Sequence, residues 1–158
     1  MIRCSDAWDD LPAWGSATQA SFWVALEQPG PWGRDALTES HLDPALGARL
    51  AASSSAAGGR VLLIRTPGHH ADRYQSRRVF VAGGLARAPW LVAGAALTPG
   101  ALEGLPWDTL AQPDPGPLLA ACPWLRPASR PVLLVCANSR RDVCCALKGR
   151  PVAVEAAT

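Results

Sequence analysis

The sequence predicts an α/β fold, and three observations support this. Short runs rich in Val, Leu and Ile, bounded by Gly or Pro, are typical of buried strands, and the clearest are 60–65 and 131–136. Asp43-Pro44 and Thr98-Pro99 each place a capping residue before a proline at the first helical position. Hydrophobic residues make up 49% of the 158 residues, which is the share of a globular chain with a sizeable core.

The first half of the chain alternates strand and helix signals. Residues 23–27 read as a first strand, and the turn-rich loop 28–33 stops it. A helix follows from Asp43-Pro44 to about residue 52, then the strand 60–65. Residues 77–82 read as the next strand, which we expect to run antiparallel to 60–65.

The second half is divided by a proline-rich stretch. Residues 89–92 fit either a short strand or a loop, and Thr98-Pro99 opens a short helix to residue 105. Residues 112–130 contain five prolines, which favours a linker. We therefore expect an N-terminal α/β part over 1–111 and the start of a second subdomain over 131–158.

The expected second subdomain is one strand-loop-helix-strand unit. The strand 131–136 precedes a loop, a helix over 141–148 and a strand over 152–155. Gly149 lies where a residue just past a helix C-terminus is commonly glycine. Such a unit is only part of a domain, so we expect this subdomain to be incomplete.

The net charge, the apolar stretches and the N-terminal sequence argue against several classes of function. Formal net charge is +2 with no long Lys or Arg run, which argues against nucleic-acid binding. No uninterrupted apolar stretch is long enough to span a membrane, and the N-terminus has no secretory pattern. We therefore expect a cytoplasmic protein. Its five cysteines are odd in number, which favours metal or redox chemistry over a disulfide framework.

Cys136 and Cys145 are the leading candidates for that chemistry. Cys136 closes a predicted strand and Cys145 lies in the predicted helix that follows, near the edge of an α/β sheet where sites form. Cys144 is adjacent to Cys145, and spacing alone does not choose between them. The spacing is not a common zinc or ferredoxin one. Metal or cluster binding, redox thiols and plain core cysteines all stay open at this point.

Several blocks of the chain resemble the sucrase/ferredoxin-like family, in the family's order, from about residue 4 to 153. The segment from Cys136 to Pro151 is similar to the family signature, and residues 23–37 are similar to its most distinctive block. The remaining blocks are Cys4-Ser5 with 15–17, 60–65 with Pro67-Gly68, and 77–82.

The resemblance implies a thioredoxin-like ferredoxin fold with a [2Fe–2S] cluster held by Cys136 and Cys145. It places the other two ligands in a His-x-x-x-His motif beyond Thr158, so the ligand set within this chain is expected to be incomplete. Arg141 and Asp142 either tune the cluster through its sulfurs or begin a charged helix.

Other residues are weaker ligand candidates. His41, His69 and His70 are the only histidines, and we expect His69 and His70 to be exposed loop residues. Cys122 lies in a proline-rich loop and is expected to pack rather than bind, while Cys4 lies near a terminus. The chain also departs from the resemblance at Asn138, where the family often has His.

We therefore expect an electron-transfer protein rather than a hydrolase. Its partner would be a redox protein, with neither nucleic acid nor membrane involved. Two alternatives remain: a cluster-free α/β binding module or non-functional remnant, and a thiol redox protein using Cys136 with Cys144 or Cys145. The absence of a Cys-x-x-Cys motif counts against the thiol protein.

Overall fold

The structure, a computed structural model, describes residues 18–67, 76–141, 143 and 145–157. Its described residues form a mixed α/β architecture around a five-stranded sheet with strand order β2-β1-β3-β4-β5. The strands are β1 (Trp23–Glu27), β2 (Arg60–Ile64), β3 (Arg77–Gly83), β4 (Trp90–Ala96) and β5 (Leu125–Pro127). The helices are α1 (Pro44–Ala56), α2 (Gly116–Ala121) and α3 (Arg150–Glu155), with 3₁₀ turns η1 (Pro99–Gly104) and η2 (Trp107–Thr109) and a π-helical turn η3 (Cys145–Gly149).

Strand β1 is an inner strand of the sheet, between the edge strand β2 and the central strand β3. It pairs in parallel with β2 and antiparallel with β3, so β3 runs antiparallel to β2 as expected, with β1 between the two strands. A parallel pair needs a long crossover connection, and the stretch containing α1 supplies it between β1 and β2. The other edge of β1 is then left for β3, which returns in the opposite direction.

Helix α1 begins where the sequence predicts. The Asp43 carboxylate accepts a hydrogen bond from the Leu46 backbone N–H at 2.7 Å, and Pro44 occupies the first turn. The helix continues to Ala56, beyond the expected end near residue 52. Its Leu50 is almost completely buried against the sheet. Asp43-Pro44 is therefore confirmed as a helix start, and only the length was underestimated.

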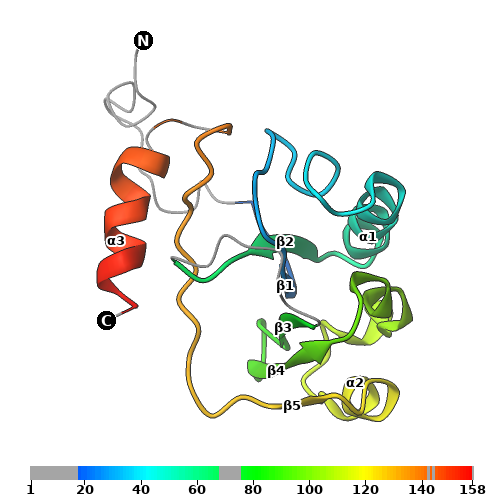
Figure 1. The fold of residues 1–158 in the computed structure, drawn as a ribbon. Coiled ribbons are helices and arrows are strands. Elements are labelled where there is room, and N and C mark those ends of the chain that lie inside the picture. The colour runs from blue at the N-terminus through cyan, green and yellow to red at the C-terminus, as the bar shows by residue number, and fades with distance from the viewer. Residues whose placement is uncertain (1–17, 68–75, 142, 144, 158) are drawn as a thin grey trace.

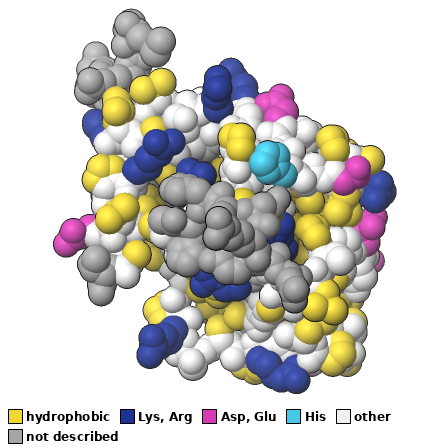
Figure 2. All heavy atoms as spheres, in the orientation of Figure 1, with side chains coloured by type: hydrophobic (Ala, Val, Ile, Leu, Met, Phe, Trp, Pro, Cys, Tyr) yellow, Lys and Arg dark blue, Asp and Glu magenta, His cyan; other side chains and the backbone are white. Residues whose placement is uncertain are grey.

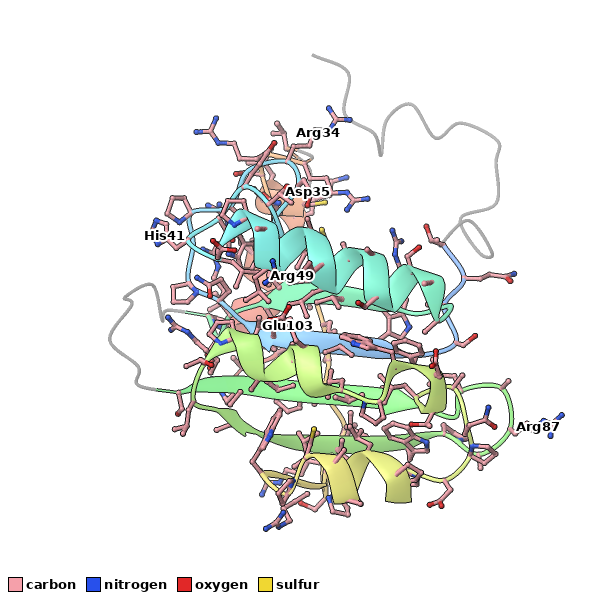
Figure 3. The ribbon with its side chains drawn as sticks, turned by 90° about the vertical axis from the view of Figure 1, so that its right-hand side faces the viewer. Arg34, Asp35, His41, Arg49, Arg87 and Glu103 are labelled. Carbon is pink, nitrogen blue, oxygen red and sulfur yellow. The ribbon has the colours of Figure 1, made fainter. Side chains whose placement is uncertain are left out.

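One face of the sheet carries α1, α2, η1 and the core. Figure 3 shows α1, η1 and α2 together on this face, and Figure 1 shows them on one side of the strands. The ion pair between Arg49 of α1 and Glu103 of η1, at 2.6 Å, lies at the surface between these two elements. The fully buried side chains beneath include the aromatic Phe22 and the strand residues Val24, Leu26, Val79, Val81 and Val92.

Residues 112–130, expected to be a linker, contain ordered elements. Helix α2 and strand β5 both fall in this stretch, and β5 pairs antiparallel with β4. Leu118, Cys122 and Leu125 are buried in the main core. Upstream, the helix expected over 98–105 is the 3₁₀ turn η1.

Residues 131–157, here called the C-terminal arm, differ from the rest. The strand predicted over 131–136 is wrong, because this segment pairs with no strand among the described residues. Within the helix predicted over 141–148, Val143 is helical and residues 145–148 belong to the π-helical turn η3, which α3 continues to Glu155. The strand predicted over 152–155 is also wrong, since these residues belong to α3. Pro151 suits a first helical turn, and the alanines and Glu155 that follow are helix formers.

The arm runs along the side of the sheet opposite α1 and α2 (Figure 1). Its apolar side chains stay largely exposed: Val132, Leu133, Leu134, Val143, Leu147, Val152 and Val154 are all more than one-third accessible. Hydrophobic side chains are visible at the surface over α3 in Figure 2. No helix of the described residues is long and apolar enough to cross a membrane.

Candidate functional site

A cleft of about 1470 Å³ lies between the arm and the β2 edge of the sheet. Its walls come from four places: the loop 32–39, the C-terminal half of α1, strand β2 with Arg65 and Pro67, and the arm with α3. Strand β2 is an edge strand, so its outer side is available to form a wall. The cleft also contains Cys136, Asn138 and Arg141 from the arm.

The loop after β1 is held against the end of β2. The backbone N–H of Gln28 donates to the Ile64 carbonyl at 2.9 Å, and Gln28 is buried. The Trp32 indole N–H donates to the Gln28 carbonyl at 3.0 Å. These two bonds fix the indole beside the mouth of the cleft, where it packs against the edge of the core.

Arg65 lies over the Trp32 ring. Its guanidinium carbon is 5.0 Å from the ring centroid, which is the geometry of a cation–π contact. A Cβ atom on Gly30 would come within 2.7 Å of the guanidinium Nη1, so glycine at this position leaves room for the arginine. Burial lowers the pKa of Arg65, and the nearby charge of Arg150 lowers it further.

The acidic residues of the loop are engaged with the loop itself. The Glu39 carboxylate accepts backbone hydrogen bonds from Arg34 at 2.7 Å and Asp35 at 3.3 Å. The Asp35 carboxylate accepts the Leu37 backbone N–H at 3.1 Å. Because both carboxylates are used to shape the turn, they are held close to the backbone of the loop, on which Figure 3 labels Asp35.

Asn138 joins the arm to the loop. Its side-chain amide N–H donates to the Gly33 carbonyl at 2.9 Å, and its amide oxygen accepts the Arg140 backbone N–H at 3.1 Å. Asn138, at which the chain departs from the family pattern, therefore makes a long-range hydrogen bond that holds the arm against the loop after β1.

Cys136 and Cys145 come from segments that are packed together. Cys136 is exposed in the arm, and Cys145 is half-buried at the start of η3. A Cβ atom on Gly149, at the end of η3, would clash with the Cys136 carbonyl oxygen. The turn that contains Cys145 thus lies directly on the backbone of Cys136, and Gly149 is required for this approach.

The other residues expected near the cysteines fall into two groups. Arg141 is exposed and lines the cleft. Cys144 and Asp142 lie outside the described residues, as do Cys4, His69 and His70. Within the described ranges, no three His, Cys, Asp or Glu side chains are grouped so as to hold a metal ion.

Cys122 is a core residue. It is 2% exposed, and burial raises the pKa of its thiol. A raised thiol pKa disfavours the thiolate that a metal ligand or nucleophile needs. The expectation that Cys122 packs in the protein interior is therefore confirmed. His41 is exposed in the loop before α1, on the side shown in Figure 3.

Sequence reasoning missed an ion pair at the end of β1, between the buried Glu27 and the exposed Arg78. Glu27 is buried and accepts three hydrogen bonds from Arg78, through the backbone N–H, Nε and Nη2, each at 3.2 Å. Arg78 also donates to the Thr66 hydroxyl. Burial by itself raises the pKa of Glu27, but the hydrogen bonds and charge of Arg78 outweigh it and hold the pKa below its ordinary value. The available signal was a charged residue ending an otherwise apolar strand.

No protein-family model, curated protein or solved structure matches the chain.

Proposed function

We propose that the chain is an electron-transfer protein of the [2Fe–2S] ferredoxin type, with Cys136 and Cys145 as cluster ligands. The observation that carries this proposal is the packing of η3 on the backbone of Cys136, which brings the two cysteine-bearing segments into contact. The similarity of residues 136–151 to the signature of a ferredoxin-like family supports it. The thioredoxin-like class and a cytoplasmic setting, where thiols stay reduced, belong to the same proposal.

The donor chemistry of the site fits one half of such a cluster. A [2Fe–2S] cluster takes four protein ligands, and thiolate sulfur is the commonest of them. The described residues supply two thiols from adjoining segments. The other two ligands therefore have to come from groups outside this pair. When bound, the cluster would carry one electron at a time.

The chain's own residues would position and tune the site. Asn138 fixes the loop after Cys136, because its side chain bonds to both Gly33 and Arg140. Arg141 lines the cleft that also contains Cys136. A cation or an N–H donor near the sulfurs favours the reduced, more negative state and so raises the reduction potential. Arg141 is therefore expected to act on the potential rather than on loading.

Anaerobic reconstitution with iron and sulfide tests the proposal. The wild-type chain is expected to bind iron and sulfide stoichiometrically and to gain a visible charge-transfer absorption. Cys136→Ser and Cys145→Ser should each lose most of the iron and the absorption. Cys122→Ala is the matched control, because it removes a buried thiol of the core and should keep both.

Two results would overturn the proposal. The first is a wild-type chain that stays folded by circular dichroism and binds no iron. The second is iron that binds equally well to the Cys136→Ser and Cys145→Ser variants. In either case the cysteines would be surface and packing residues of the arm.

A further inference from the structure

The cleft is lined by an excess of arginine. Its walls carry five arginine side chains and two carboxylates among the described residues. The arginines come from the loop, from β2 and its end, and from the arm: Arg34, Arg60, Arg65, Arg141 and Arg150. Residues far apart in the sequence thus bring positive charge to one concave surface, which concentrates the electrostatic potential there.

None of these five arginines forms an ion pair within the described part of the chain. Other arginines of the protein do so. Arg49 pairs with Glu103 at 2.6 Å, and Arg78 pairs with Glu27 at 3.2 Å. The two carboxylates of the cleft, Asp35 and Glu39, accept hydrogen bonds from the backbone of their own loop instead.

Arg65 is the arginine most removed from water in this set. It is half-buried, whereas Arg34, Arg60, Arg141 and Arg150 are exposed. Burial lowers the pKa of Arg65, and the positive charge of Arg150 lowers it further. A partly buried cation beside a second cation is electrostatically unfavourable, and a bound anion would relieve both the desolvation and the repulsion.

Arg65 is also pre-positioned. Its guanidinium rests on the Trp32 ring, and Trp32 is itself fixed by its hydrogen bond to Gln28. Guanidinium groups bind phosphate through two parallel N–H···O bonds, and a side chain that is already ordered loses less conformational entropy when it binds. The contact with Trp32 thus holds Arg65 ready for an oxyanion.

We propose that this cleft binds the phosphate group of a small molecule, with Arg65 and Arg150 as its principal cations. Arg65 follows the end of β2 and Arg150 begins α3, so the bound anion would bridge the sheet and the C-terminal arm. The inference goes beyond electron transfer and does not depend on a cluster, because neither cysteine is among the groups that bind the anion.

Calorimetric titration of the full chain with inorganic phosphate, in a low-chloride buffer, tests this proposal. The wild type is expected to bind saturably with one site. Arg65→Gln and Arg150→Gln should each weaken binding about tenfold, because each variant removes a charge-assisted hydrogen-bond donor to the anion. Arg65→Lys keeps the charge but loses the paired donors, so its affinity for phosphate should lie between those of the wild type and Arg65→Gln.

Arg87→Gln is the matched control. Arg87 is an exposed arginine in the turn between β3 and β4, away from the cleft (Figure 3), and its loss should leave phosphate binding unchanged. Cys136→Ser should also bind phosphate normally, which separates this site from the cluster site. Iron loading of Arg65→Gln should likewise remain, so failure of either proposal can be recognised without the other.

Three results would overturn the inference: no saturable binding by the wild type, equal weakening in Arg87→Gln, or full binding by folded Arg65→Gln and Arg150→Gln variants. A short single-stranded oligonucleotide provides a further arm. Tight binding of the oligonucleotide with no binding of phosphate would mean that the arginines serve a nucleic acid, and it would also overturn the proposal.

Discussion

Two five-residue segments of nearly the same composition adopt different structures in this protein: one is a strand of the sheet and the other lies outside it. Arg60–Ile64 reads Arg-Val-Leu-Leu-Ile and forms β2, with Val61 at 7% and Leu63 at 9% exposure. Residues 131–135 read Pro-Val-Leu-Leu-Val and lie outside the sheet, with Leu133 at 72% and Leu134 at 45% exposure. The difference teaches that an apolar run becomes a strand only where a partner strand and a covering helix are provided.

The partners of β2 come from its immediate surroundings. All five of its residues are in register with β1, and α1 packs against it after a short turn. Segment 131–135 follows β5, which is short and lies at the opposite edge of the sheet. Its residues instead cross the side of the sheet opposite α1 and α2 (Figure 1). The arm is therefore attached by a few specific contacts rather than by a strand ladder.

The largest expected effect comes from truncating the equivalent leucine in each segment. Leu63→Ala should lower the free energy of unfolding by about 2–4 kcal/mol, because it leaves a cavity in the core. Leu134→Ala removes a side chain that is already half-exposed, and should cost less than about 1 kcal/mol. Urea denaturation followed by circular dichroism measures both. Equal losses would mean that segment 131–135 is packed as firmly as β2.

A second prediction concerns the charged end of β1, where Glu27 is the last residue of the strand. Glu27→Gln should destabilise the fold by about 1–3 kcal/mol near neutral pH, since it removes the charge that Arg78 binds at 3.2 Å. The pKa of Glu27 is lowered in the folded state, so its contribution is fully present above the ordinary pKa of 4.5 and is lost as pH falls below it.

The pH dependence supplies the check on this assignment. The stability difference between wild type and Glu27→Gln should be constant from about pH 6 to 8 and should shrink as pH falls below about 4.5. Denaturation curves at several pH values measure it. Arg49→Gln, which removes an ion pair at the surface, is the comparison and should have a much smaller effect on stability than Glu27→Gln. A difference that grows on acidification would contradict the assignment.

The sequence predicted the elements that carry their own local signals. The cap at Asp43-Pro44 and the apolar runs that become β1, β2 and β3 can be recognised from neighbouring residues alone. Only the first half of strand β4 could be predicted from the sequence, because its second half is Gly-Ala-Ala and has little strand propensity. It forms because β3 pairs with all seven of its residues.

The segments whose structure the sequence did not predict correctly depend on contacts between residues far apart in the chain. Prolines made residues 112–130 resemble a linker, yet β5 ends on Pro127 at the edge of the sheet, where proline is tolerated. In the arm, the alternating valines of 152–155 suggested a strand, but the helix formers around them prevail. The contact of Arg65 with Trp32 could not be read from spacing, since it joins a loop to a strand end more than thirty residues later.

The smallest expected effect tests how the arm is held. Asn138→Ala removes the hydrogen bond to the Gly33 carbonyl, the long-range polar contact between the arm and the loop. We expect the free energy of unfolding of the sheet to change by less than about 0.5 kcal/mol, because the core is untouched.

The arm itself should respond much more strongly than the sheet. Losing one hydrogen bond of about 1 kcal/mol should raise amide exchange in α3 about fivefold, while exchange in β1 and β3 stays the same. Hydrogen-exchange mass spectrometry of the two regions measures this ratio. Asn138→Asp is a useful second variant, because it keeps the acceptor for the Arg140 N–H and loses only the donor to Gly33. Equal acceleration of exchange in both regions would show that the arm and the sheet unfold together. In that case β2 and segment 131–135 would differ in solvent exposure but not in stability.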